Sequence, residues 1–378
     1  MGTLSRCHAI GLERPGRMSH HQRIRYLQAS DHVKLAWAET GTGPLLVKAS
    51  NWLSHLEYDW ESPIWSHWLR FFSDRFRLIR YDERGCGMSD WNIDDLSFDR
   101  RLADLEAVIE AAGLHDPFAL VGISQGAGIC IAYAIRHPER VSRLVLYGGY
   151  ARGARGRNDP EQDQFFRALV DVIRVGWAQD NPAFRQVFTS RFIPGASNEQ
   201  VKWFNDLCRK TSSAPAAAAL LESRGAMNVT DLLPQVRTPT LVLHGRHDEV
   251  VPIAEGRLIA AGIRGAEFVE LDSRNHILLE GEPAWQRFQD EVAAFLGVAT
   301  PATEDTAFAS LSPREREILA RLTEGLSNAE IAERLGVSEK TVRNHLSNLF
   351  DKLGVWSRAQ AMVLARDRGF KDGDRSRL

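Results

Sequence analysis

The fold of the first part of the chain is indicated by the stretch Phe118-Ala-Leu-Val-Gly-Ile-Ser-Gln-Gly126. Its first half is a short apolar run, as expected for a strand in a sheet that is covered on both faces. Its second half reads Gly-x-Ser-x-Gly, and a helical pattern extends from Gln125 to Arg136. The two glycines permit a sharp turn between strand and helix, which would lift the hydroxyl of Ser124 above the sheet. Ser124 is therefore a candidate nucleophile.

Two later segments supply the partners that such a serine needs. Asp248 follows the apolar run Thr240–His244, and His276 follows the run Glu267–Leu271. The order Ser124, Asp248, His276 along the chain is that of the catalytic triad in α/β-hydrolases. In such a triad the histidine takes the serine proton, and the aspartate fixes the tautomer and stabilises the charged imidazole. The three residues are therefore predicted to form a serine-hydrolase triad.

Two other segments resemble the same superfamily. Residues 81–90 (Tyr-Asp-Glu-Arg-Gly-Cys-Gly-Met-Ser-Asp) resemble its D-x-R-G-x-G-x-S loop, and residues 136–141 (Arg-His-Pro-Glu-Arg-Val) resemble its usual helix-to-strand turn. The resemblance implies an α/β fold in which residues 22–297 form an α/β-hydrolase-like domain. The strands expected in this domain are short apolar runs: Pro44–Lys48, Phe76–Tyr81, Phe118–Gly122, Leu144–Tyr147, Thr240–His244 and Glu267–Leu271.

One long segment interrupts the alternation of strands and helices. Residues 151–233 have the pattern of consecutive helices, rich in Trp, Phe and Arg, between two strands. They are expected to form a helical cap over the sheet edge and to enclose an apolar pocket. Side chains such as Trp177, Phe188 and Phe204 are expected to line this pocket, although the same pattern suits the core of the cap itself.

The segment that begins at Lys48 departs from the superfamily pattern. A His-Gly pair is usual there, but this chain has Lys48-Ala-Ser-Asn-Trp-Leu-Ser-His55, with Asn51 in the place of the glycine. Asparagine tolerates the left-handed conformation better than most residues, so the turn is expected to survive. The oxyanion hole is then predicted from the backbone N–H groups of Trp52 and Gln125. Residues 52–60 also resemble α/β-hydrolase domains fused to regulatory partners, which favours a sensing role.

The C-terminal segment has the signals of four short helices. Ser312 and Ser327 each begin a capping box, and Ser338 is expected to cap the third helix. On that helix apolar residues recur at spacings of three and four from Val342 to Leu353, which predicts a stripe facing the core. Arginine and asparagine on the opposite face can pair with guanine and adenine in the major groove, and lysine and threonine suit phosphates. The predicted DNA-binding residues are Lys340, Thr341, Arg343, Asn344, Ser347 and Lys352.

The order of residues in this segment closely resembles the LuxR-type (GerE-like) helix-turn-helix domain over residues 309–370. The stretches that carry the resemblance are Leu311-Ser-Pro-Arg-Glu-Arg-Glu-Ile-Leu319, Gly325-Leu-Ser-Asn-Ala-Glu-Ile-Ala332 and Val337-Ser-Glu-Lys-Thr-Val-Arg-Asn-His-Leu346. The resemblance implies a recognition helix from Ser338 to Leu353. It also implies a homodimer on double-stranded DNA through the fourth helix, Ser357–Arg368, and a role in regulating transcription.

Composition agrees with a chain of more than one domain, because it has 378 residues and ordinary proportions of apolar and charged side chains. The net charge is −2, so DNA contact requires a local basic patch; from Ala309 onward there are 13 Lys and Arg against 10 Asp and Glu. Because no Cys/His cluster has zinc spacing and no apolar run has membrane-spanning length, we expect a cytoplasmic protein without metal, other cofactor or membrane contact. Residues 1–21 are expected to be an N-terminal extension, 298–308 a linker and 371–378 a tail.

Three functions of the hydrolase-like domain are compatible with these observations. The domain can be a sensor that binds a small acyl or ester-like ligand and controls DNA binding. It can be an active serine esterase or lactonase whose reaction is itself the signal. It can also be an inert dimerisation platform, although an intact triad counts against this. The fold does not decide between them, because function is a property of the site.

Overall fold

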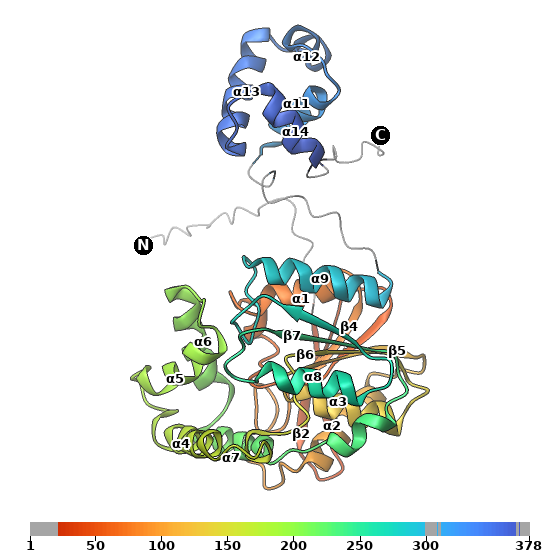
Figure 1. Ribbon diagram of the computed structural model, residues 1–378, viewed down its shortest axis with the longest axis vertical. Helices are drawn as coiled ribbons and strands as arrows, with labels where there is room; N and C mark the ends of the chain where they lie inside the picture. The colour runs from red at the N-terminus through yellow and green to blue at the C-terminus, as the bar shows by residue number, and fades with distance from the viewer. Residues whose placement is uncertain (1–21, 299–307, 309–310, 368–369, 371–378) are drawn as a thin grey trace, which may run out of the picture. The chain divides into compact units, whose positions relative to one another are not determined.

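The computed structural model describes residues 22–298, 308, 311–367 and 370, which form two compact units that divide after Val298 (Figure 1). The predicted N-terminal extension and tail, and most of the predicted linker, lie outside the described residues. None of the described helices combines the length and the hydropathy that crossing a bilayer requires. Cys86, Cys130 and Cys208 are buried free thiols.

The described part of the first unit is built on an eight-stranded sheet with the strand order β1-β2-β4-β3-β5-β6-β7-β8. Strand β2 pairs antiparallel with both β1 and β4, and the remaining pairs are parallel. The strands are β1 Arg23–Gln28, β2 Lys34–Thr40, β3 Leu45–Lys48, β4 Arg77–Tyr81, β5 Phe118–Ile123, β6 Val141–Tyr147, β7 Thr240–Gly245 and β8 Glu267–Leu271.

The six apolar runs identified in the sequence correspond to β3 through β8, which confirms the predicted α/β fold. The antiparallel hairpin β1–β2 was not predicted, because its first strand lies at the sheet edge and is largely exposed. A strand of this kind carries charged residues and lacks the continuous apolar run that marks a strand covered on both faces. Strand β5, in contrast, is buried at all six positions.

Helices cover both faces of the sheet, and each face has its own hydrophobic core (Figure 1). Helices α1 (Ser66–Ser73) and α9 (Pro283–Leu296) pack on one face through Trp68, Phe72 and Phe288. Helices α2 (Phe98–Ala111), α3 (Gly126–Arg136) and α8 (Ile253–Gly262) pack on the other. Because the strands are parallel, the loops at their carboxyl ends meet at one edge, where ligand sites of such sheets are found.

Between β6 and β7 lies a helical insertion that runs from Ala154 to Gln235. An isolated antiparallel bridge joins Arg152, just before the insertion, to Asn228, which lies shortly before η3. Trp177 and Phe204 are buried inside the insertion and belong to the same hydrophobic core as the apolar residues of α1 and α9. The insertion contains η2 Ala154–Gly156, α4 Pro160–Gly176, α5 Ala183–Phe192, α6 Asn198–Thr211, α7 Ala214–Gly225 and η3 Thr230–Gln235.

The second unit is a small helical domain, in agreement with the predicted fold class. Its described helices are α11 Pro313–Thr323, α12 Asn328–Leu335, α13 Glu339–Leu353 and α14 Arg358–Asp367. Ser312 and Ser327 complete capping boxes, and the side chain of Ser338 caps α13 by accepting from the backbone N–H of Thr341. The apolar stripe of α13 is buried against α11 and α12. This packing leaves the opposite face of α13 exposed.

Candidate active site and nucleic-acid interface

The turn at Ser124 has the conformation that its two flanking glycines were expected to allow. Ser124 has a φ of +54°, and its backbone N–H donates to Tyr147 on the neighbouring strand at 2.9 Å. A Cβ atom on Gly122 would lie 2.8 Å from the backbone of Ala127, and one on Gly126 would lie 2.9 Å from a backbone oxygen of Ser50. Only glycine fits at both positions, so strand β5 and helix α3 can hold the serine at the end of the strand.

The structure brings the three residues of the predicted triad into one hydrogen-bonded chain. The Oγ atom of Ser124 lies 3.0 Å from Nε2 of His276, and Nδ1 of His276 lies 2.6 Å from Oδ2 of Asp248. His276 is 1% exposed, and its ring packs edge-on against Phe192 of the helical insertion. These distances allow proton transfer from the serine to the imidazole, and from there to a leaving group.

Asp248 is held as a carboxylate from both sides. Its Oδ1 accepts from the backbone N–H groups of Val250 and Val251 at 2.8 and 3.0 Å, while Oδ2 faces His276. Burial raises the pKa of the Asp248 carboxyl, but the imidazole of His276 and the hydrogen bonds outweigh it, so the pKa lies below its ordinary value. An ionised aspartate at this position favours the tautomer of His276 that presents an unprotonated Nε2 to the serine.

The predicted oxyanion segment is present, but its conformation differs from the expectation. Among the described residues other than glycine, positive φ angles occur at His32, Ser124 and Asn158, so Asn51 does not adopt the left-handed conformation. The side chain of Asn51 makes local hydrogen bonds: its Oδ1 accepts from the ammonium of Lys48, and its Nδ2 donates to the carbonyl of Trp52.

The backbone N–H groups of Trp52 and Gln125 donate to no other group in the described part of the chain. Both residues border the same cavity as Ser124. An oxyanion hole requires two unoccupied donors beside the nucleophile, and these two N–H groups meet that requirement. Their role as oxyanion-hole donors stays a prediction.

A buried polar network behind the oxyanion segment was not predicted. The carboxylate of Asp82 accepts from the hydroxyl of Ser54 at 2.8 Å and from the backbone N–H of Leu56 at 3.0 Å. Burial lowers the pKa of the Lys48 ammonium and raises the pKa of the nearby Asp59 carboxyl. The resemblance of residues 81–90 to the D-x-R-G-x-G-x-S loop could have indicated this network, because the aspartate of that motif is Asp82. Asp82 connects the loop after β4 to the oxyanion segment after β3.

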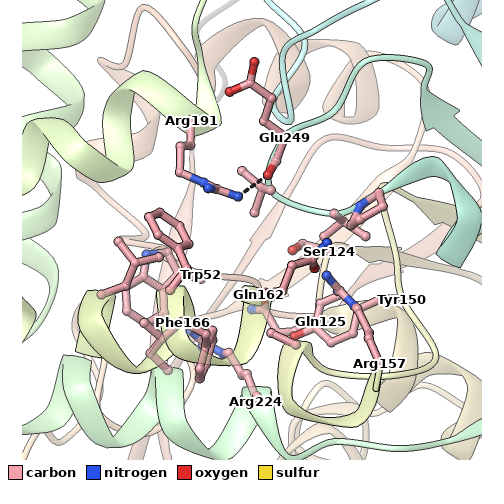
Figure 2. A pocket seen from close by; sticks show the side chains of 18 of the residues that line it. Trp52, Ser124, Gln125, Tyr150, Arg157, Gln162, Phe166, Arg191, Arg224 and Glu249 are labelled. Carbon is pink, nitrogen blue, oxygen red and sulfur yellow. Dashed lines mark hydrogen bonds between the residues drawn. The ribbon is translucent and has the colours of Figure 1, made fainter. Parts of the chain in front are cut away.

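A cavity of about 490 Å³ opens onto Ser124 and is bordered largely by the helical insertion (Figure 2). Phe188 lines it as predicted, but Trp177 and Phe204 do not, because both are buried in the core of the insertion. The cavity is also more polar than expected, since the guanidinium groups of Arg157, Arg191 and Arg224 border it. These arginines were not predicted, because they belong to helices and loops without a recognisable motif.

The predicted DNA-contact residues are mostly gathered on the exposed face of α13. Lys340, Arg343, Asn344 and Ser347 are exposed there, whereas Thr341 is half-buried and its hydroxyl contacts that of Ser338 at 2.8 Å. Arg343 also contacts Glu339 at 3.2 Å. An exposed pair of this kind contributes little to stability, so the arginine can exchange it for a contact with DNA.

Lys352 is set apart from these residues. Its ammonium lies 2.7 Å from the carboxylate of Glu315, a residue of α11 whose side chain is 4% exposed. The same carboxylate accepts from the backbone N–H of Ser312 in the capping box. Lys352 thus joins α13 to α11, and its charge is already paired, which is at odds with the predicted phosphate contact.

We therefore expect Lys352→Ala to act on stability, and Lys340→Ala to act on DNA binding. Loss of Lys352 leaves the buried Glu315 carboxylate with fewer partners, which should destabilise the domain by about 1 kcal/mol after allowance for solvent. Hydrogen exchange of the α11 and α13 amides in the full chain measures this effect. Lys340→Ala should leave exchange unchanged and lower the salt dependence of DNA binding. If Lys352→Ala left exchange unchanged and lowered the salt dependence of DNA binding, Lys352 would be a phosphate contact, as the sequence predicts.

The same pair predicts a pH dependence. Burial raises the pKa of Glu315, but the hydrogen bonds from Lys352 and Ser312 outweigh it, so the pKa lies below the ordinary 4.5. A carboxyl with a lowered pKa contributes stability above its unfolded value and loses it as the pH falls through the folded value. The difference in the stability of α11 and α13 between wild type and Lys352→Ala, measured by amide hydrogen exchange, should therefore shrink below pH 4.5.

Comparison with known proteins assigns each unit of the chain. Residues 57–283 match the family described as alpha/beta hydrolase fold, and residues 309–365 match the family described as bacterial regulatory proteins, luxR family. The first match accounts for more than half of the chain, and the second spans α11 to α13 and most of α14.

Individual relatives agree with both assignments. The chain is 27% identical to the AB hydrolase superfamily protein YisY of Bacillus subtilis over 66% of this chain and 91% of that protein. It is 37% identical to the probable transcriptional regulatory protein SgaR of Hyphomicrobium methylovorum over 52% of this chain and 70% of that protein. The crystal structure of a hydrolase from Pseudomonas aeruginosa PA01 has the same fold, with a TM-score of 0.61 at 24% identity, over 73% of this chain and 98% of that one.

Proposed function

Since the chain belongs to the α/β-hydrolase fold family and carries a LuxR-family DNA-binding domain, we propose that it is a transcriptional regulator controlled by a serine-hydrolase site that cleaves a small acyl ester or lactone. The observation that carries the proposal is the continuous chain from Ser124 through His276 to Asp248 at the edge of the cavity. A platform without chemistry has no need of this arrangement. The protein acts at double-stranded DNA, hence in the cytoplasm.

The reaction follows from the positions of these groups. Oγ of Ser124 attacks the carbonyl carbon while Nε2 of His276 takes its proton, and the N–H groups of Trp52 and Gln125 hold the negative oxygen of the tetrahedral intermediate. Collapse of the intermediate breaks the bond to the alcohol, which leaves with the proton from His276. Water then attacks the acyl-enzyme with His276 as base, which releases the acid and restores the serine.

The two parts of the chain are proposed to communicate through dimerisation. The surface around α14 carries apolar side chains that are exposed to solvent, above all Trp356, which is 89% exposed, and Val363. A groove beside them is lined by Gly354, Val355, Ala359 and Leu364 among others. We infer that α14 pairs with a second copy on DNA, and that ligand or product in the hydrolase-fold domain alters how two copies associate.

Covalent occupation of the site tests whether it controls DNA binding. A DNA site is selected from a random pool by the wild-type chain, and its affinity is measured before and after labelling of Ser124 with a fluorophosphonate. We expect affinity to change by about 1–3 kcal/mol, the usual size of coupling between two sites. Ser124→Ala, treated identically, is the control and should show no change. Equal affinity of fully labelled and unlabelled wild type would support the platform function instead.

Ser124→Ala also separates signalling by reaction from signalling by binding. Unlabelled wild type and Ser124→Ala are compared with 4-nitrophenyl butyrate present. If the ester changes DNA affinity in both proteins, the site acts as a sensor. If it binds both but changes DNA affinity in wild type alone, the reaction is the signal.

A further inference from the structure

The charges around the cavity are unequally distributed between its interior and its mouth. Of the three arginines that border it, Arg224 is 3% exposed and the side chain of Arg157 is 10% exposed. Among the carboxylates that border it, Glu161 and Glu249 are exposed, and the half-buried Asp159 accepts from the backbone N–H of Gln162 at the start of α4. Figure 2 shows the guanidinium groups around the open space in front of Ser124. Positive charge is thus concentrated where a bound molecule would be shielded from water.

Arg157 has donors that the protein does not use. Its Nε donates to the carbonyl of Arg152 at 3.1 Å and lies 4.0 Å from Glu255, a carboxylate that Arg152 itself holds at 2.7 Å. Within the described residues its two terminal nitrogens make no hydrogen bond. The guanidinium lies over the ring of Tyr150, 5.5 Å from its centroid. This leaves the planar edge of the guanidinium, which suits a carboxylate, available toward the cavity.

Arg224 is a second incompletely used cation. One of its terminal nitrogens binds the carboxylate of Glu83, but its other terminal nitrogen and its Nε are buried and have no partner in the described part of the protein. Its guanidinium lies over the ring of Trp52, 4.7 Å from the centroid. A buried donor without an acceptor costs free energy, which an acceptor supplied by a ligand would recover.

The rest of the lining is suited to a short hydrocarbon chain. Phe166, Leu169, Phe188 and Leu221 border the same cavity, and its volume of about 490 Å³ admits a small molecule but not a long lipid. A ligand that complements this lining has an acyl carbonyl at Ser124, a few apolar carbons, and an anionic oxygen group at the arginines. A neutral ester would leave the guanidinium donors unpaired.

We propose that the pocket selects esters or lactones whose acyl part carries an ionised carboxylate in addition to the ester carbonyl. Arg157 binds this carboxylate with both terminal nitrogens, and Arg224 supplies a further donor. This inference rests on the proposed hydrolase function for the position of the carbonyl, but anion binding does not require turnover. Arg191 is not assigned this role, because one of its terminal nitrogens already donates to the backbone carbonyl of Glu249 and the two are therefore not both available to a carboxylate.

A pair of matched esters tests the proposal without catalysis. Monomethyl adipate and methyl hexanoate have the same six-carbon acyl chain and differ by the terminal carboxylate. Binding of each to the full-length Ser124→Ala chain is measured by calorimetry at fixed ionic strength. We expect monomethyl adipate to bind at least about tenfold more tightly, the effect of one charge-assisted contact. Equal affinity of the two esters, or a preference for methyl hexanoate, would overturn the proposal.

Arginine variants assign the preference to its residues. In the Ser124→Ala background, Arg157→Met should abolish the preference for the carboxylate, and Arg157→Lys should retain part of it because the charge remains without the planar fork. Arg209→Met is the matched control: this arginine of α6 is exposed, pairs with Asp180 and does not border the cavity. Loss of preference in the control as well would contradict a local site. Because the ester comparison uses both arginines intact, it remains decisive even if Arg157→Met fails to fold.

Turnover distinguishes failure of this inference from failure of the proposed function. Wild type is assayed with the 4-nitrophenyl monoester of adipic acid and with 4-nitrophenyl hexanoate. Hydrolysis of both at equal kcat/KM would support the hydrolase and contradict the carboxylate preference. Tight binding of monomethyl adipate without hydrolysis of either ester would contradict the hydrolase and support the anion site.

Discussion

Ser124→Ala is expected to lower the rate of ester hydrolysis by a factor of about 10⁴ or more and to abolish labelling by a fluorophosphonate. The reason is that the variant lacks the only oxygen placed 3.0 Å from Nε2 of His276 among the described residues. His276→Ala should cost nearly as much, because the serine hydroxyl then has no base. The double variant should be no slower than either single variant, since members of a triad act as a unit. Steady-state kinetics with 4-nitrophenyl butyrate measures all three.

Asp248→Asn and His137→Ala complete this test. The asparagine keeps the shape of Asp248 but does not favour the required tautomer of His276, so a loss of roughly 10⁴-fold is expected. His137 lies at the end of α3 opposite to Ser124 and pairs with Glu106, so its removal should leave the rate unchanged. Turnover that survives in Ser124→Ala would show that the triad is not the catalytic site. Folded wild type that neither turns over nor reacts with the probe would leave the sensor as the function of the pocket.

The sequence was sufficient for features that depend on local chemistry. The glycines around Ser124 and the order of Ser124, Asp248 and His276 predict a cluster, and the structure brings these residues within hydrogen-bond distance. The serines at residues 312 and 327 predict helix starts because a capping box is satisfied within four residues. The residues that interact are either close in sequence, as in the capping boxes, or lie in loops that the parallel sheet brings to one edge, as in the triad.

Features that depend on packing between distant segments were not predictable in the same way. The pattern of α13 indicates that Lys352 is accessible, but it contains no information about Glu315, which approaches from another helix. The aromatic residues of the insertion could line a pocket or fill a core, and Trp177 and Phe204 fill the core. Asn51 does not adopt the left-handed conformation, and its side chain binds Lys48, a contact that its backbone propensity does not indicate.

Replacing both Arg343 and Asn344 with alanine is expected to remove most of the preference of the chain for its own DNA site. Each bidentate contact with a base edge is worth about 1–3 kcal/mol, so the pair together should cost about 2–6 kcal/mol on the selected site. The loss on a scrambled duplex should be much smaller, because phosphate contacts carry nonspecific binding. Fluorescence anisotropy with both duplexes at one salt concentration gives the ratio directly.

The structure makes this variant a clean test of base reading. Both side chains are exposed, and the ion pair that Arg343 makes with Glu339 is also at the surface, so the double replacement should leave the fold of the domain intact. Arg321→Ala removes a comparable charge from α11, where the arginine pairs with Glu324, and should leave the ratio between the two duplexes unchanged. If the double variant bound both duplexes as tightly as wild type, residues elsewhere on the domain would read the bases. If both duplexes lost affinity equally, Arg343 would be a phosphate contact, because a base contact must distinguish the two sequences.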